Sequence, residues 1–485
     1  MNTQDIMKLI DLKGESIMPK IITEQLAIFD PIAAKMKADY DFYLGNVPVK
    51  KRSINETLSG GINNKLPQDY AGDIVDTGNG YFLGVPIKIK YDGSEDEQKY
   101  LDDFAKTNNV DLVNESTGRY AACCGYASRL CYIDLNGDVK IMNTLPWETC
   151  FIINTDTDEA QYAFIVYDWS IVNYETGKEK KTRRLEWYDK KNVSIYVQEG
   201  KKWILDNINL QTENGEIEKS NPAPHTFDFV PLIQFKNNEN LKNDFYKVID
   251  NINAMDSLLS DAQNELEQFR AGYMAVTGGL IDEEERSKAK RTGVFNLIDP
   301  DAKIDFLKKE LPVDYLKEQR DKLNENIYKF AKSVDMNNEK FVGGGPESGE
   351  SRKWRLMSLE FKTISKERNF SHGLLTMYKI LMTAWNKGKY NFDYLKLSFQ
   401  FIRSLPQDLL YATNVNTALV GTISDKTRLT LMPFIKNADD ELKLMAEEKA
   451  ADPPIDFNTP AQQYDKNGKP IDASGAPIDS TGYQA

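Results

Sequence analysis

The spacing of apolar residues changes along the chain from helical to strand-like and back to helical. Over residues 1–45 the apolar positions step by three and four, as at Ile6, Leu9 and Ile10, which predicts two helical segments. A polar loop at 52–65 follows, and then a third helical pattern at 66–77. The glycines and Pro86 after it predict the end of that helix and the start of an extended segment at 87–91.

Residues 125–235 carry strand-like runs separated by turns. The runs 130–133 and 139–141 flank Asn136-Gly137, a strong hairpin signal. Four more runs lie at 163–167, 184–188, 193–197 and 203–205, with a further strand at 230–235. Together they predict a mostly antiparallel sheet laid on helices, which is an α+β fold.

From residue 240 the chain becomes helical again. Residues 240–273 contain neither Pro nor Gly before Gly272, and their apolar positions predict one long amphipathic helix. The following stretch combines a charged patch at 282–286 with short strands at 293–297 and 304–307. Pro312, tolerated in a first helical turn, opens a second long helix that is expected to run to about 334.

A glycine-rich loop at 337–350 separates that helix from a third one. Ser351 is placed to cap the third helix, which is expected to reach about residue 385 with a bend at Gly373. Further helices are predicted after Pro406, with apolar positions from 409 to 434. From Asp452 the composition is that of a disordered tail.

Composition narrows the classes of function. The 485 residues suggest ~2–4 folding units, and 41% hydrophobic with 28% charged residues is typical of a soluble globular protein. The net charge of −13 argues against tight wrapping of nucleic acid, although it permits DNA that is surrounded without being gripped. With only 2 His in the chain, multi-histidine metal sites and His-based catalysis are not expected.

The cysteine pattern points to a reducing compartment. The four cysteines contain no Cys-x-x-Cys pair, and we expect them to be buried free thiols; they are Cys123, Cys124, Cys131 and Cys150. The first residues lack the pattern of a signal peptide, and no apolar run approaches the length of a membrane span. A soluble cytosolic protein is therefore expected.

Two stretches come close to ligand-binding motifs. Gly344-x-x-x-x-Gly349-Glu350-Ser351 lacks the lysine of a nucleotide-binding P-loop, and Glu350 in its place would repel phosphates. Residues 154–158 resemble the start of a calcium loop but lack the later glycine and bidentate acid, so a solvated turn is expected. His225 and His372 define no catalytic triad, and we predict no catalytic residue, metal site or cofactor.

Basic residues are concentrated on the third long helix and at its start. Their spacing favours a charged, solvent-exposed face, while Arg352 and Lys353, beside the glycine loop, are candidates to touch phosphates. The set is Arg352, Lys353, Arg355, Lys362, Lys366 and Arg368.

The order of short motifs resembles the portal proteins of tailed bacteriophages, of the siphophage type. The resemblance covers about residues 35–450, and each motif is short, but their order along the chain is specific. The motifs are Phe42-Tyr43-Leu44-Gly45-Asn46, Asn63-Asn64-Lys65, residues 74–87 and 230–238, Asp250, Asp256, Ser260, Asp261 and Asn264, and residues 348–370.

This resemblance implies the portal fold and a ring-forming subunit. In the family's terms, 1–239 would be an α/β wing, 240–273 and 312–335 the two stem helices, and 274–311 a small α/β clip. Residues 336–350 would be the tunnel loop, 351–404 the tunnel helix and return to the wing, 405–451 a helical crown, and 452–485 a disordered tail.

The resemblance also implies sites and partners. Double-stranded DNA would pass the tunnel loop and adjoining helix at Lys340, Gly343, Gly344, Gly345, Pro346, Glu347, Ser348, Gly349, Arg352 and Lys353. Partners would meet the clip at Asp282, Glu283, Glu284, Glu285, Arg286 and Lys288. The implied partners are further copies in a ring of usually twelve, the large terminase subunit, a head-completion or adaptor protein, and the major capsid and scaffold proteins.

The implied function is a conduit for DNA packaging and ejection at one capsid vertex, in a virion assembled in the bacterial cytoplasm. The glycines of the tunnel loop would allow different loop conformations in neighbouring subunits. Two alternatives remain open at this point: an enzyme such as a nuclease built on the sheet domain, and a non-catalytic capsid adaptor or scaffold-binding module. Metal-dependent DNA cleavage would favour the first, and a monomer that does not assemble would favour the second.

Overall fold

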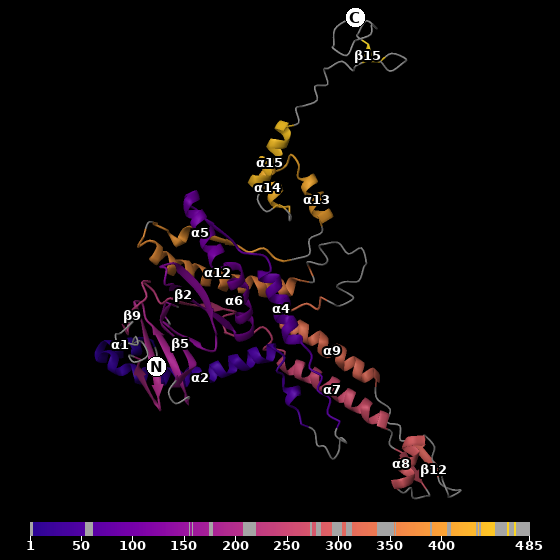
Figure 1. Ribbon diagram of the computed structural model, residues 1–485. Coiled ribbons are helices and arrows are strands. Elements are labelled where there is room, and N and C mark those ends of the chain that lie inside the picture. Colours follow the sequence, from indigo (N-terminus) through magenta and orange to yellow (C-terminus); the bar gives the residue numbers. More distant parts are fainter. Residues whose placement is uncertain are drawn as a thin grey trace. The chain divides into compact units, whose positions relative to one another are not determined.

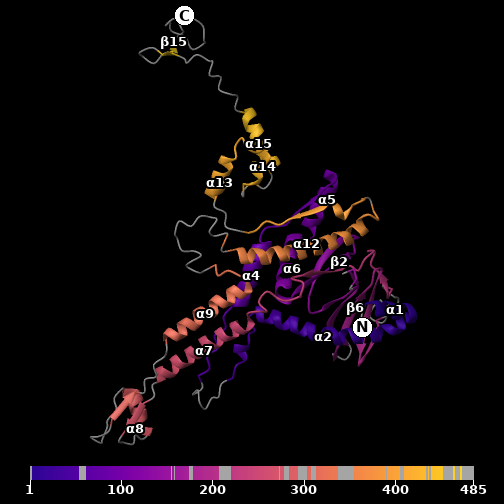
Figure 2. The ribbon, with the colours of Figure 1, turned by 180° about the vertical axis from the view of Figure 1, so that it is seen from behind.

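A computed structural model of the chain divides into two compact units, Met1–Ser404 and Leu405–Ala485, each described by itself. Figures 1 and 2 give the path of the chain from opposite sides. The structure describes residues 3–53, 62–154, 156–157, 159–173, 178–206, 220–271, 274–277, 283–292, 303–306, 313–336, 354, 356–388, 390–404, 409–432, 435, 438–451, 463–464 and 470–471.

The first unit opens with the two predicted helical segments. They are α1 (Thr3–Lys13) and α2 (Met18–Tyr43), joined by a short 3-10 turn, η1 (Gly14–Ile17). The apolar side of α2 buries Ile22, Leu26 and Phe29 against a sheet, in a cluster with Phe164 and Trp187. The helical periodicity of this segment therefore reflects burial against strands far along the chain.

A second short turn, η2 (Pro48–Lys51), precedes α4 (Tyr70–Leu83). The prediction of a helix at 66–77 was misplaced at both ends. Asp69 caps the helix by accepting a hydrogen bond from the Gly72 amide, so the helix begins at Tyr70. It continues through Gly78 and Gly80 and packs against α6 (Val110–Cys124), where a Cβ at Gly118 would collide with Asn79 and Leu83 of α4. The chain then gives way to the extended β1 (Lys88–Tyr91).

The strand-rich region forms two main antiparallel sheets. The smaller has the order β10-β2-β3, built from β2 (Tyr126–Ile133), β3 (Val139–Thr144) and β10 (Leu232–Lys236). The predicted hairpin between β2 and β3 is confirmed: Gly137 has φ 87°, and the Asp134 carboxylate accepts from the amides of Asn136 and Asp138.

The larger sheet follows β4-β5-β6-β7-β8, with β9 paired to β7. Its strands are β4 (Thr149–Ile153), β5 (Ala160–Asn173), β6 (Lys178–Tyr188), β7 (Asn192–Glu199), β8 (Lys202–Leu205) and β9 (Ala223–Pro224). The α+β class is therefore correct, but the single predicted sheet is two. A third pair, β1 with β13 (Leu397–Gln400), joins segments more than 300 residues apart.

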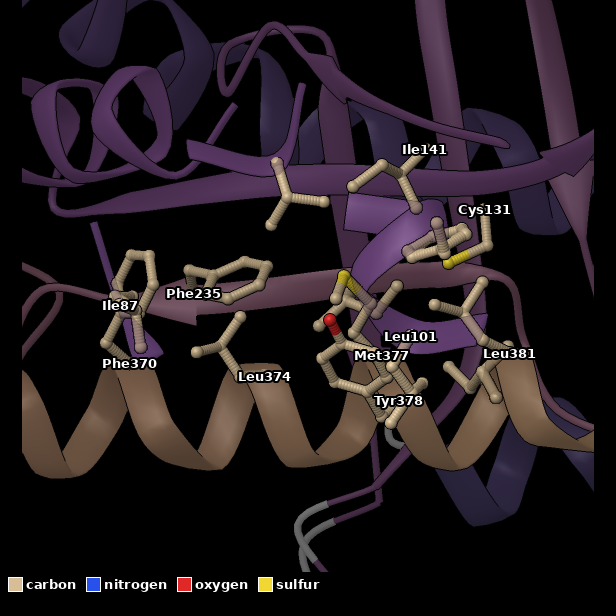
Figure 3. Packing of buried hydrophobic residues seen from close by; sticks show 14 of the residues in the cluster. Ile87, Leu101, Cys131, Ile141, Phe235, Phe370, Leu374, Met377, Tyr378 and Leu381 are labelled. Carbon is tan, nitrogen blue, oxygen red and sulfur yellow. The ribbon is translucent and has the colours of Figure 1, made fainter. Parts of the chain in front are cut away.

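The long helix α12 (Met357–Trp385) lies along β10 in the centre of the unit, next to α5 (Glu95–Thr107). Leu374, Met377 and Tyr378 are fully buried against this sheet (Figure 3). Gly373 lies against this sheet: a Cβ there would be 2.5 Å from the Phe235 ring, so glycine permits the close approach of β10. The helix begins at Met357, six residues after Ser351, which therefore does not cap it.

The helix predicted at 240–273 is shorter. Residues 240–248 are not helical, and Leu241 has a φ of 51°. The side-chain amides of Asn237 and Asn238 both donate to the Lys242 carbonyl. These competing hydrogen bonds delay the start of α7 (Ile249–Ala271). Across the intervening segment, the second helix is α9 (Val313–Ala331), close to its predicted range.

Between α7 and α9 the chain forms β11 (Met274–Thr277), α8 (Glu283–Thr292) and β12 (Lys303–Phe306). The predicted strand at 304–307 is confirmed as β12, which pairs antiparallel with β11. Residues 283–286 of the charged patch form the first turn of α8. The strand predicted at 293–297 lies outside the described residues.

The second unit contains α13 (Leu409–Ala418), α14 (Asp425–Thr430) and α15 (Ala438–Ala451), which confirms a helical region after Pro406. Ser424 caps α14, and a 2.7 Å ion pair between Lys426 and Asp439 links α14 to α15. The tail prediction falls mainly on residues outside the described ranges, apart from the paired strands β14 (Gln463–Tyr464) and β15 (Pro470–Ile471).

Candidate functional site at the helix-pair junction

The two long helices α7 and α9 lie side by side and are called the helix pair below (Figures 1 and 2). At the end nearest the body of the unit they share a hydrophobic cluster in which Ile252, Met255 and Ile327 are fully buried. Two tyrosine hydroxyls add polar links: Tyr70 donates to Asn324 at 2.8 Å, and Tyr328 donates to Asp73 at 2.7 Å. The pair is thus anchored to α4 as well as to itself.

An extended segment, residues 62–68, runs along α7 and is called the strap. Its backbone amides donate to acceptors on one side of the helix. The amide of Asn64 donates to Asn264 at 2.7 Å, and its side-chain amide donates to the same oxygen at 3.0 Å. The remaining two bonds join the Leu66 amide to Ser260 at 3.0 Å and the Gln68 amide to Asp256 at 2.8 Å.

The match between strap and helix is geometric. Two residues of extended chain advance ~6.6 Å, and four residues of α-helix advance ~6.0 Å. Every second amide of the strap therefore meets every fourth residue of α7, with the two segments antiparallel. An ion pair between Arg52 and Asp261 continues the attachment. Asp256, Ser260, Asp261 and Asn264, part of the motif that suggested the family, are the residues that hold the strap.

Asp256 is the most unusual of these acceptors. Its side chain has no exposed surface, and one carboxylate oxygen lacks a hydrogen-bond partner among the described residues. Burial raises the pKa of Asp256 to about 6, although the hydrogen bond from Gln68 acts in the opposite direction. The carboxyl therefore changes its charge near neutral pH inside the attachment of the strap.

A buried charge cluster lies where the turn before α7, the end of α9 and α12 meet, and we call this place the junction. Lys366 donates to one oxygen of Asp244, and the Lys362 Nζ lies 3.4 Å from the same oxygen. Asn237 donates to the other oxygen at 2.9 Å. Lys362 also donates to the Ala331 carbonyl at 2.9 Å, which connects the cluster to the end of α9.

The charges of the junction depend on one another. Burial would raise the pKa of Asp244, but Lys362 and Lys366 outweigh it and hold that pKa at about 2. Burial lowers the pKa of Lys362 to about 8, partly offset by Asp244. The Asp244 carboxylate thus keeps its charge in a buried place because the two lysines stabilise it, whereas the charge of Lys366 contributes to the lowered pKa of Lys362.

The prediction that the basic residues of α12 form a solvent-exposed face is therefore wrong for two of them. Lys362 and Lys366 point into the protein and neutralise Asp244, while Arg368 is exposed. The acids of the same helix also have a partner from elsewhere: Glu360 and Glu367 both bind Arg403, at 3.0 and 2.7 Å. Arg352, Lys353 and Arg355 lie outside the described residues.

Most of the expected clip residues lie within the described ranges, whereas the expected tunnel residues do not. Glu283, Glu284, Glu285, Arg286 and Lys288 all fall on α8, and Glu283, Glu284 and Lys288 are exposed. Asp282 lies outside the described residues, as do Lys340, Gly343, Gly344, Gly345, Pro346, Glu347, Ser348 and Gly349.

The remaining chemical candidates are accounted for within the described ranges. The thiols of Cys123, Cys124 and Cys131 are free and buried, as expected, and Cys150 is partly buried. No three His, Cys, Asp or Glu side chains of the described part gather as ligands of a metal ion. None of its helices combines the length and the apolar character needed to cross a membrane.

Sequence reasoning missed two buried charges. Asp244 was not predicted as a site residue. Two lysines four residues apart on one helix could have indicated a buried acid facing them. Arg129 was also missed: it is fully buried, with acceptors on Asn114, Thr117 and Asn143 and the Phe235 ring 4.6 Å away. A lone arginine in a strand carries no sequence signal for such a site.

The mixture of helices and antiparallel sheets in the described residues is consistent with a phage portal protein, and sequence comparison shows this class. Residues 26–454 match the family described as phage portal protein, SPP1 Gp6-like. The chain belongs to this family.

Two relatives carry the name "Portal protein". The one from Bacillus phage SPP1 is 24% identical over 463 residues, covering 92% of this chain and 86% of the relative. The one from Clostridium phage phiCD119 is 24% identical over 232 residues, covering 46% of this chain and 50% of the relative. Neither name describes an enzyme.

Proposed function

We propose that this portal protein assembles into a ring of twelve subunits at one vertex of a phage capsid, and that double-stranded DNA passes through the central channel. Membership of the portal family over most of the chain carries the proposal. In this role the protein conducts DNA during packaging and ejection and nucleates assembly of the procapsid in the host cytoplasm. It does so as a structural component, without catalysing a reaction.

We assign the parts of the ring subunit as follows. Residues 1–239 form the wing, α7 and α9 the stem, and the segment between them, 274–311, the clip. The tunnel loop is 336–350, and 351–404, including α12, lines the tunnel and returns to the wing. Residues 405–451 are the crown, followed by the tail.

The charge distribution supports a conduit that does not hold DNA tightly. The net charge is −13, and Lys362 and Lys366 are occupied by Asp244. A duplex that must slide is favoured by few strong phosphate contacts, because each one adds to the barrier between successive positions. Within this proposal the tunnel residues near DNA are Lys340, the glycine-rich run at 343–349, Arg352 and Lys353.

Partner docking is assigned to the clip. The exposed side of α8, with Glu283, Glu284 and Lys288, would meet the large terminase subunit during packaging and a head-completion or adaptor protein afterwards. Major capsid and scaffold proteins would contact the ring at the wing and crown.

The first test is the mass of the purified full-length protein by light scattering, followed by negative-stain imaging. A mass near twelve subunits, with rings that have a central hole, supports the proposal. A monomer that fails to assemble with scaffold or capsid protein overturns it and favours an adaptor or scaffold-binding module.

The clip assignment has its own test. The double substitution Glu283→Gln/Glu284→Gln should weaken terminase binding to the ring without changing the ring's mass. Asp102→Asn/Asp103→Asn, which alters an exposed acidic pair on α5, is the matched control and should leave binding unchanged. Equal terminase affinity for both variants and the unaltered protein would contradict the clip assignment alone.

A further inference from the structure

A cavity of about 250 Å³ lies between β10, α12 and the turn that joins β4 to β5, and we call it the wing pocket. Its apolar lining comes from several elements that are distant in sequence: Phe151, Phe229, Leu232, Leu375, Ile380 and Tyr394. Volume and lining suit one branched aliphatic side chain together with a short piece of backbone.

The polar part of the lining is mainly cationic. Three lysines, Lys190, Lys236 and Lys379, face a single acid, Glu159. Lys379 lies 3.0 Å from Glu159 and 4.5 Å from the centre of the Phe229 ring, so its ammonium is held over the apolar lining. The excess of positive charge favours an anionic ligand.

Gln234 adds a hydrogen-bonding requirement. Its side-chain oxygen is buried and has no partner among the described residues, and the residue lines the same pocket. A buried acceptor without a donor costs free energy, which a ligand with an N–H group would recover. The lining of the pocket is therefore complementary to a ligand with an aliphatic group, a carboxylate and an N–H donor close together. A short acidic peptide combines these groups.

The chain carries such a peptide three times near its C-terminus. Pro-Ile-Asp occurs at 454–456, 470–472 and 477–479, and nowhere else in the 485 residues. Each copy offers a branched aliphatic side chain, a carboxylate on the next residue and the backbone N–H groups of Ile and Asp. Proline restricts the backbone before binding, which lowers the entropy lost on docking.

We propose that the wing pocket binds a Pro-Ile-Asp segment from the C-terminal tail of a second copy of this chain. The isoleucine fills the apolar part, the aspartate faces Lys379 and Lys190, and a peptide N–H donates to Gln234. The inference rests on the proposed ring only for the source of the second copy. Three repeats per tail raise the effective concentration at a pocket, so weak single contacts become a lasting link between subunits.

The test measures binding of a labelled peptide, residues 472–481, by fluorescence anisotropy. The host is the full-length chain with Asp456→Asn, Asp472→Asn and Asp479→Asn, which reduces competition from its own tails. We expect saturable binding, weakened about tenfold by Asp479→Asn in the peptide or by Lys379→Gln in the pocket, since each removes one partner of a charge pair.

Two further variants keep the result interpretable. Lys190→Gln changes an exposed pocket lysine and should weaken binding without affecting folding, while Lys191→Gln, its neighbour outside the lining, should not. Absence of saturable binding, or equal binding to the Lys190→Gln, Lys379→Gln and Lys191→Gln proteins, overturns the proposal. Displacement of the peptide by other acidic peptides lacking isoleucine would also overturn it.

The outcome is separable from that of the proposed ring. If the protein binds the peptide but stays monomeric, the pocket assignment is supported and the proposed ring is contradicted. If the protein forms rings that do not bind the peptide, the portal function is supported and the tail is excluded as the occupant of the pocket.

Discussion

At the scale of single residues, Asp244 joins the turn before α7 to two helices, α12 and α9, that are distant in sequence. Its carboxylate holds Lys362 and Lys366 of α12, and Lys362 in turn holds the last turn of α9. Arg129 is buried differently: it contacts neutral oxygens, a sulfur and an aromatic ring, and burial lowers its pKa to about 10. Both charges depend on tertiary contacts.

Replacing Asp244 should reveal how much the junction relies on it. Asp244→Asn leaves two buried ammonium groups without a counter-ion, and the free energy of unfolding is expected to fall by ~3–5 kcal/mol. Denaturant unfolding followed by fluorescence measures the loss. Asp30→Asn, which breaks the more exposed ion pair with Arg183, is the control and should cost only ~0–1 kcal/mol. Equal losses in the two variants would refute the role of Asp244.

Asp256 should make stability depend on pH in the opposite sense to Asp244. The pKa of Asp256 rises from 3.8 to about 6 on folding, so the native state binds more protons than the unfolded state between these values. The free energy of unfolding attributable to it therefore falls as pH rises from about 4 to 6. For Asp244, whose native pKa is about 2, stability is instead lost as pH falls below about 4.

The measurement is the free energy of unfolding at several pH values between about 4 and 7. Asp256→Asn should remove ~1–3 kcal/mol of this variation, because the amide keeps an acceptor for Gln68 but does not titrate. Ser257→Ala, which changes an exposed side chain beside Asp256 on α7 that does not titrate, should leave the profile as it is. An unchanged slope in Asp256→Asn would show that this carboxyl does not titrate in that range.

At the scale of elements, the strap explains why α7 has polar residues on a buried side. Asp256, Ser260 and Asn264 are buried because they accept hydrogen bonds from the strap, so the helix has one side for the hydrophobic cluster and another for backbone amides. An apolar residue at these positions would leave buried N–H groups without acceptors.

Removing one acceptor should loosen the strap locally. Ser260→Ala deprives the Leu66 amide of its partner, and hydrogen exchange in a peptide covering 62–69 should become about 2- to 10-fold faster. Ser257→Ala, an exposed position one turn away, is the matched control. Equal exchange in both variants would mean that the hydrogen bond to Ser260 does not limit opening of the strap.

Boundaries of elements were predicted well where the residue types at a turn signal it directly. The β2–β3 hairpin follows from Asn136-Gly137 and Asp134, all within five residues. The starts of α7 and α4 also depend on local hydrogen bonds, but apolar spacing gives no sign of them: the side-chain amides of Asn237 and Asn238 donate to the Lys242 carbonyl, and Asp69 accepts from the Gly72 amide.

At the scale of the whole molecule, the hydrophobic clusters of the described residues all belong to the first unit. Their members lie between residues 6 and 401, and they join the N-terminal helices, both main sheets and α12. The second unit has the helices α13, α14 and α15, and the ion pair between Lys426 and Asp439 is one of its internal links.

A chain ending at Ser404 should therefore fold by itself. Its thermal midpoint is expected to stay within ~2 °C of the first transition of the full-length protein, because its clusters are complete. Calorimetry and near-UV circular dichroism provide the comparison. Loss of cooperative unfolding in the shortened chain would show that residues 405–485 are needed for the core.

The local sequence was sufficient for the α+β class, most of the helices and strands, the free buried thiols and the portal family. These follow from periodicity, turn residues and the order of short motifs, which act over a few residues or are read directly along the chain. The candidate site was different: the sequence located α8 and the α7 motif residues but not what they touch.

Tertiary structure decided the junction, the strap and the wing pocket. Lys362 and Lys366 have the spacing of an exposed basic face, and only the approach of Asp244, more than 100 residues away, turns them inward. The strap pairs residues about 200 positions apart, and the wing pocket joins a turn, a strand and α12. Burial and ion pairing depend on which segments meet in space, and that is settled by the packing of the whole unit.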